Sequence, residues 1–146
     1  MNKAIENYAT AIYQNTMTGV QSIRDIESKV EDERLKAELL READEFNIIA
    51  ERLKRFAVKN DFKVQENNFI EKSRLWASIN MTTLFDRTSR HIAEMMLLGT
   101  VMGLITCYKD KYDHQNISEE LDSILQQLED LEEENYLTLK KYLKSL

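Results

Sequence analysis

Apolar side chains recur every three or four residues along the first sixty positions of the chain. This spacing places them on one face of an α-helix. Two helices are therefore predicted, the first over about residues 2–29 and the second beginning at Asp32, whose side chain can accept from the free amides of the next turn. The two stripes are Ile5, Tyr8, Ala9, Ile12, Thr16, Gly19, Ile23, Ile26 and Val30, then Leu35, Leu39, Phe46, Ile49, Leu53 and Ala57.

A loop is predicted after the second helix. The pairs Asn60-Asp61 and Asn67-Asn68 favour turns over helix interiors. Residues 69–112 are again compatible with a helix, but a straight helix of that length would reach about 66 Å at 1.5 Å per residue. We therefore expect a kink or a break near residues 79–83, where Asn and Thr cluster, so that this stretch forms either one kinked helix or two.

A last helix is predicted from Ser118 to the end of the chain. Acidic residues occupy its first turn and lysines its last turns, and both complement the helix dipole. These residues are Glu119, Glu120, Lys140, Lys141 and Lys144.

The chain has no proline and three glycines in 146 residues, so little in it interrupts helices. The fold class expected is all-α. The simplest packing is an antiparallel four-helix bundle in one domain over residues 1–146, with a partly helical crossover between the second and third long helices.

Charge and composition limit the classes of partner and the cellular location that the chain can be expected to have. The net charge is −6, so we expect no nucleic-acid partner, which usually needs a basic face. The longest uncharged run, Met95–Tyr108, is shorter than the roughly 20 residues of a membrane span, so none is expected. Glu6 lies where a signal peptide needs apolar residues, and Cys107 is the one cysteine. A cytoplasmic protein with a buried free thiol is the expectation.

Gly99 and Gly103 are spaced as in G-x-x-x-G within the third long helix. Each glycine in a helix costs roughly 0.5–1 kcal/mol relative to Ala. The favoured explanation is close approach of a bulky neighbour or of the first helix at Gly19. The alternative is a small-ligand pocket lined by methionines, namely Met95, Met96 and Met102.

Two acidic residues fall on apolar helix faces. Glu132 lies among the leucines of the last helix, with Asn135 one turn further on, and Glu42 lies within the stripe of the second helix. Buried acids are costly unless they are paired or bind metal. The favoured interpretation places each at the edge of its stripe, in reach of water, and the alternative buries both.

His91 and Glu94 could bind a metal together. They are three residues apart, which puts them on one side of a helical turn. Asp86, Arg87 and Arg90 share that side, so a solvated face is the favoured interpretation. The candidate metal ligands are thus Glu42, His91, Glu94 and Glu132, and no catalytic residue is predicted.

Four long helices, a crossover after the second and inward carboxylates on the second and fourth resemble the ferritin-like superfamily. The stretch from His91 to Gly103 is similar to a segment of small bacterial helical proteins. The resemblance implies a metal site built from two Glu and two Glu-x-x-His motifs. Here Glu132 is followed by Asn135 in the histidine position, and Glu42 by Glu45.

The sequence therefore favours a non-catalytic structural or interaction module with no cofactor. The alternative is an oxidoreductase or metal-storage protein that binds iron or another divalent metal. Leu97, Leu98, Val101 and Ile105 extend the apolar surface of the third long helix beyond its inward face. A helix that is apolar all round must be covered on every side. Either the segment around Trp76 folds over this surface or a second chain does, and the favoured expectation is self-association as a dimer through these four residues.

Overall fold

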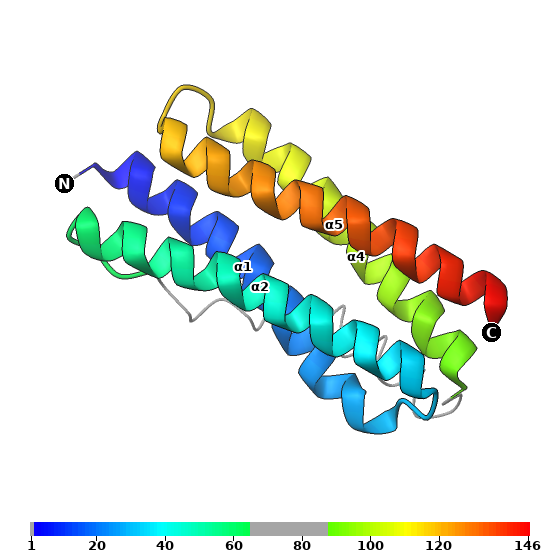
Figure 1. The fold of residues 1–146 in the computed structure, drawn as a ribbon. Helices are drawn as coiled ribbons and strands as arrows, with labels where there is room; N and C mark the ends of the chain where they lie inside the picture. The colour runs from blue at the N-terminus through cyan, green and yellow to red at the C-terminus, as the bar shows by residue number, and fades with distance from the viewer. Residues whose placement is uncertain (1, 65–87) are drawn as a thin grey trace.

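The computed structural model describes residues 2–64 and 88–146. Their elements are α1 (Lys3–Ile26), the 3₁₀ turn η1 (Glu27–Lys29), α2 (Glu33–Lys59), α4 (Ser89–Asp113) and α5 (Glu119–Ser145). The described part of the chain is all-α, with four long helices and no strand, as predicted (Figure 1). The predicted kink near residues 79–83 lies outside the described residues.

Each long helix begins at a capping side chain, which explains where these segments become helical. Asp32 accepts from Leu35 N and Ser118 from Leu121 N, so both predicted starts are confirmed. Asn2 and Thr88 do the same for α1 and α4. The prediction of a single helix to residue 29 is wrong in its last turn, because the chain tightens there into η1 and Val30 N donates to Glu27 O.

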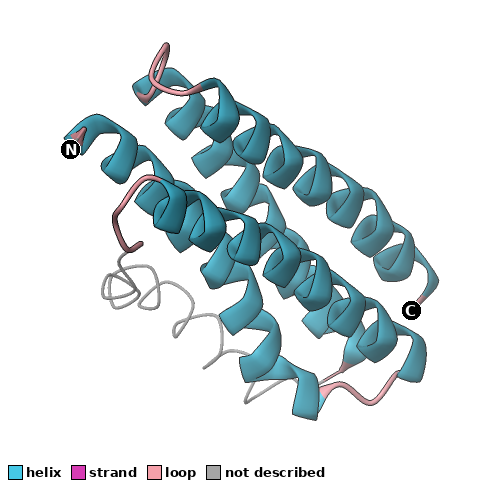
Figure 2. Ribbon diagram, turned by 60° about the vertical axis from the view of Figure 1, so that its left-hand side comes forward, coloured by secondary structure: helices cyan, strands magenta, loops and turns pink. Residues whose placement is uncertain are grey.

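The four helices pack into one bundle around a single apolar core (Figures 1 and 2). The start of α5 lies beside the start of α1, where Tyr8 Oη donates to Asp122 at 2.7 Å, and beside the end of α2, where Lys59 pairs with Glu120. The far end of α5 lies beside the start of α2, because Tyr142 Oη donates to Arg34 O. These contacts fix which helix ends meet.

Helix α4 is apolar on more than its inner side. Ile92, Ala93 and Cys107 are fully buried, whereas Leu98 and Ile105 are half-exposed. Among the described helices α4 alone is long and apolar enough to cross a membrane by length and composition, a property that core helices of soluble proteins share. Within the bundle, this composition supplies both a buried face and an exposed apolar one.

A cavity with two buried carboxyl groups

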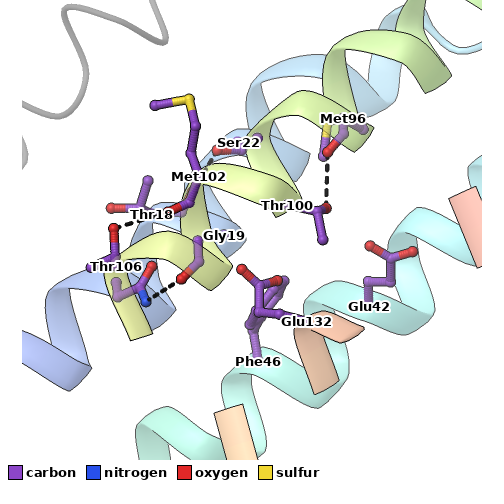
Figure 3. A pocket seen from close by; sticks show the side chains of 13 residues that line it. Thr18, Gly19, Ser22, Glu42, Phe46, Met96, Thr100, Met102, Thr106 and Glu132 are labelled. Carbon is purple, nitrogen blue, oxygen red and sulfur yellow. Dashed lines mark hydrogen bonds between the residues drawn. The ribbon is translucent and has the colours of Figure 1, made fainter. Parts of the chain in front are cut away.

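A cavity of about 300 Å³ lies in the middle of the bundle, where small side chains of α1 and α4 leave room beside α2 and α5. Figure 3 shows Glu42 of α2 and Glu132 of α5 reaching into it, with Thr100 of α4 between them in this view. The lining residues are Asn15, Thr18, Gly19, Ser22, Glu42, Phe46, Met96, Gly99, Thr100, Met102, Gly103, Thr106 and Glu132. Well-packed interiors contain few voids larger than a water molecule, so this space is a distinct feature of the fold.

Two of the glycines admit bulky neighbours, as the sequence predicted. A Cβ built on Gly19 would lie 2.7 Å from the Phe46 ring, and one on Gly103 would overlap Oε2 of Glu132. Gly103 therefore makes the space that the Glu132 carboxyl group fills. All three glycines line the cavity, and so do Met96 and Met102, whereas Met95 is buried elsewhere. Of the two glycines of the G-x-x-x-G pair, Gly103 has the predicted bulky neighbour, and a cavity lined by two of the three named methionines lies beside it.

Glu42 and Glu132 are buried, so the interpretation that placed them at the edges of their stripes is wrong. Their exposed fractions are 1% and 5%. The physical reason is that four helices, rather than two, enclose these positions: α1 and α4 close over the faces that a helical wheel of one helix leaves open.

Glu42 interacts with an acidic neighbour one turn earlier on the same helix. Its Oε2 accepts no hydrogen bond from any described residue, while Glu38 bonds to its carboxyl group. Two carboxyl groups attract each other only when one of them carries a proton. Burial first, and then the hydrogen bond and negative charge of Glu38, raise the pKa of Glu42 to about 10. Glu42 is therefore the protonated member of the pair.

Glu38 is the ionised member, because it is held by Arg41. Arg41 Nε and Nη2 donate to its two oxygens at 2.9 and 2.8 Å. Burial alone would raise the pKa of Glu38, but the hydrogen bonds from Arg41 and Glu42 outweigh it and leave the pKa below its ordinary value. The Arg41 side chain is 39% exposed, so this chain of contacts connects the cavity to solvent.

Glu132 also favours its neutral form. Burial raises its pKa to about 8, and Asn135, one turn further along α5, opposes this rise only in part. The buried thiol of Cys107 lies near enough to Glu132 for their charges to interact; burial chiefly, and then this carboxyl group, raise the pKa of Cys107. Neither group gains a cationic partner from the described residues.

The four hydroxyl groups that line the cavity direct their protons away from it. Each donates to the backbone carbonyl four residues earlier on its own helix, which is the usual bond for Ser and Thr inside helices. The pairs are Thr18 to Gln14, Ser22 to Thr18, Thr100 to Met96 and Thr106 to Met102, at 2.6–3.0 Å. Their oxygens keep lone pairs but offer no proton to the cavity.

Asn15 also directs its hydrogen-bond donor away from the cavity. Its Nδ2 donates to Gly103 O at 3.2 Å and to Cys107 Sγ at 3.5 Å. Because a carbonyl oxygen can only accept, the amide nitrogen must face α4, and the remaining polar atom of the side chain, Oδ1, is an acceptor. Asn15 thus ties α1 to α4 at the same turn where Gly103 admits Glu132.

The other two candidate ligands are elsewhere. Neither His91 nor Glu94 lines the cavity; His91 is half-buried and Glu94 is exposed. Over residues 2–64 and 88–146, no three side chains of His, Cys, Asp or Glu come together closely enough to hold a metal ion. The donor set in the described residues, two carboxyl groups and no imidazole, does not fit the metal centre that the ferritin-like resemblance implies.

The sequence did not single out the hydroxyl residues of the wall. Thr18, Ser22, Thr100 and Thr106 are ordinary helix residues in a sequence, and their side chains gain a role only where α1 and α4 face each other. A signal was present in the pattern, since small residues recur at Gly99, Thr100, Gly103 and Thr106 of α4.

Comparison with known proteins gives no match to a family model, to a curated protein or to a solved structure.

Gly103→Ala should destabilise the fold, because its Cβ would displace the Glu132 carboxyl group. Overpacking usually costs about 1–3 kcal/mol, which exceeds the roughly 0.5–1 kcal/mol that Ala gains over Gly in a helix. Urea unfolding measures the change. Glu132→Ala removes the obstacle, so the double variant should lose less stability than the sum of the two single losses. Additive losses would show that the two residues do not interact in this way.

Stability should fall as the pH rises from about 5 to about 8. Unfolded, both carboxyl groups ionise near their ordinary value of 4.5; folded, Glu132 stays protonated to about 8 and Glu42 to about 10. The folded chain therefore binds more protons over this range, and raising the pH favours unfolding. Thermal midpoints across this range measure the effect.

Glu42→Gln is the matched variant for this titration, since its amide can still donate to Glu38. We expect a shallower fall and a higher midpoint than wild type near pH 8. A wild-type midpoint that rises between pH 5 and pH 8 would contradict the assignment of buried neutral acids.

Proposed function

We propose that this chain is a non-catalytic binding module that holds a small molecule in the cavity of its helical bundle. The observation that carries the proposal is the cavity of about 300 Å³, lined by an aromatic ring, thioethers and a few converging polar groups. Binding sites for small molecules combine an apolar lining with a few polar groups in this way. An apolar cavity of about 150 Å³ is known to bind benzene, so this one has room for a larger ligand.

The wall supports binding better than catalysis. A hydroxyl nucleophile needs a base that accepts its proton. Here each hydroxyl proton is directed at a main-chain carbonyl of its own helix, and the two acids favour their neutral forms. The polar groups are arranged to recognise a ligand.

The proposal includes an antiparallel, ferritin-like arrangement of the helices. It is supported by the meeting of the α5 start with the end of α2, through Lys59 and Glu120, and of the α5 end with the start of α4, through Arg90 and Leu143. It is also supported by the inward carboxyl groups of α2 and α5. A cytoplasmic location without a membrane span belongs to the same proposal and fits the buried thiol of Cys107.

Small phenyl compounds should bind in the cavity. Phenethylamine and propylbenzene are suitable probes, and binding should shift the methyl resonances of Met96 and Met102, which line the wall. A ligand at a hundred times its dissociation constant stabilises the fold by about 2.7 kcal/mol, which a thermal midpoint detects. Both readouts are expected to change for at least one probe.

Thr100→Phe fills the cavity and should abolish this binding, while Ala37→Phe adds the same ring on the exposed side of α2 and should leave it intact. If neither probe changes the methyl resonances or the midpoint of the wild-type protein, the cavity is not a binding site of this kind.

The metal-binding alternative gives a different result. Ferrous, manganous or zinc ions would then raise the thermal midpoint of the wild type, and Glu132→Gln would remove the gain. The observation in its favour is that two carboxyl groups reach one cavity; the described residues bring no third His, Cys, Asp or Glu side chain to them. Structural and catalytic metal sites usually need three or four protein ligands, so we favour the organic ligand.

We also propose that two copies associate through the exposed side of α4. Leu98 and Ile105 are half-exposed there, and Tyr108 and Tyr112 continue the same face towards the end of the helix. Leu97 and Val101, also predicted for this surface, are partly buried, and Leu97 packs against the core of its own chain. Contiguous exposed apolar surface of this kind marks interaction sites.

Sedimentation should show a dimer of the wild type that Ile105→Asp dissociates, because the aspartate would be buried without a partner at the interface. Val58→Asp is the matched control, since Val58 is 80% exposed on α2, away from this face. A monomeric wild type would contradict the proposal.

A further inference from the structure

We propose that the ligand of this cavity is a small organic cation with an apolar body, such as an arylalkyl ammonium, and that it binds by replacing a proton on one of the two buried acids. This inference rests on the proposed function. The chemistry of the ligand is inferred from the polar atoms of the cavity wall that can still form hydrogen bonds.

The wall of the cavity offers acceptors. The hydroxyl protons of Thr100 and Thr106 are used on their own helix, and so are those of Thr18 and Ser22, which leaves four oxygens with lone pairs. Asn15 uses its Nδ2 on α4. Glu42 shares its proton with Glu38, so the hydrogen that the described lining side chains can still present is the acidic proton of Glu132.

Glu42 has an atom waiting for a donor. It is 99% buried, lines the cavity, and its Oε2 accepts no hydrogen bond from the described residues. A buried acceptor without a donor costs free energy that a ligand N–H can recover. An anionic ligand would instead meet carboxyl groups and lone pairs, and a purely apolar one would leave them unpartnered.

A bound cation would also favour the ionised form of a buried acid over its protonated form. The groups facing Glu42 are Glu38 and Arg41 on α2 itself and Glu132 on α5. Those facing Glu132 are Glu42 on α2, Cys107 on α4 and Asn135 on α5, and Asn15 Oδ1 of α1 lies at the same turn of α4. A ligand ammonium brings the positive charge that none of these supplies inside the cavity. One carboxylic O–H then ionises, the ammonium N–H donates to the carboxylate, and the proton leaves to solvent.

Of the two acids, Glu132 should release its proton more easily, because no ionised neighbour of the Glu38 kind raises its pKa. Glu42 has the connection to solvent through Glu38 and Arg41. A monovalent ligand should therefore release about one proton. Its affinity should increase about tenfold for each unit that the pH rises, up to about pH 8, as the exchange of one proton requires.

Calorimetric titration compares phenethylamine with two compounds of the same shape, neutral propylbenzene and anionic hydrocinnamate. We expect phenethylammonium to bind at least tenfold more tightly than propylbenzene near pH 7, and hydrocinnamate to bind more weakly than either. Repeating the titration in buffers of different ionisation enthalpy counts the released protons and needs no variant. Equal affinity for phenethylamine and propylbenzene, or binding without proton release, would overturn this inference while leaving the cavity a binding site.

Variants locate the exchange. Glu132→Gln should abolish most of the proton release and reduce the preference for phenethylamine over propylbenzene at least tenfold. Glu42→Gln leaves Glu132 in place and should retain both the proton release and the preference; loss of both in Glu42→Gln alone would assign the exchange to Glu42. Glu94→Gln, on the exposed side of α4, is the matched control and should behave as wild type. If none of the three compounds binds to the wild-type protein, the proposed function itself fails, and the inference with it.

Discussion

The burial of two carboxyl groups in the middle of the bundle is the constraint on which the rest of the structure depends. An ionised carboxylate in such a place is very costly, so the acid must be neutral, paired or bound to a cation. Glu42 solves this by sharing a proton with Glu38, which in turn is held by Arg41. Glu132 has no such partner, and its burial favours the protonated form. The two acids therefore differ in what they need from their surroundings.

The cavity lies beside the two carboxyl groups, in space that small residues on the neighbouring helices leave unfilled. Gly103 has no side chain where the Glu132 carboxyl group lies, and Gly19 has none where the Phe46 ring lies. Glycine in a helix costs stability, and here two of the three glycines are matched to a bulky group on a neighbouring helix. The small residues between them on α1 and α4 leave a volume that neither acid fills. The small residues that let the helices accept a carboxyl group thus also create the space beside it.

The helices and their ends were predictable from the sequence, because caps and apolar stripes are local. Asp32 and Ser118 begin α2 and α5 as expected, and the turn at Asn60 and Asp61 is where two turn-forming residues occur. The burial of Glu42 and Glu132 was not predictable in the same way, since one helical wheel shows which face a residue shares and not how many helices close over it. The hydroxyl residues were harder still, because the direction of a hydroxyl proton depends on the backbone of its own helix and on what α1 and α4 leave between them.

The low polarity of the cavity connects the raised pKa values of its two acids to the proposed preference for a cationic ligand. The low polarity that keeps Glu132 protonated also strengthens any charge interaction inside the cavity, so a bound cation regains much of what ionising the acid costs. A divalent metal would need three or four ligands in a fixed geometry, and the described wall has two carboxyl groups. An ammonium group needs only acceptors for its three N–H donors, which carboxyl and hydroxyl oxygens supply without further rearrangement of the helices. For the proposed ligand, a wall that offers oxygens and retains few hydrogens of its own would therefore discriminate by the charge and donor capacity of the ligand head, while Phe46 and the methionines would contact its apolar body.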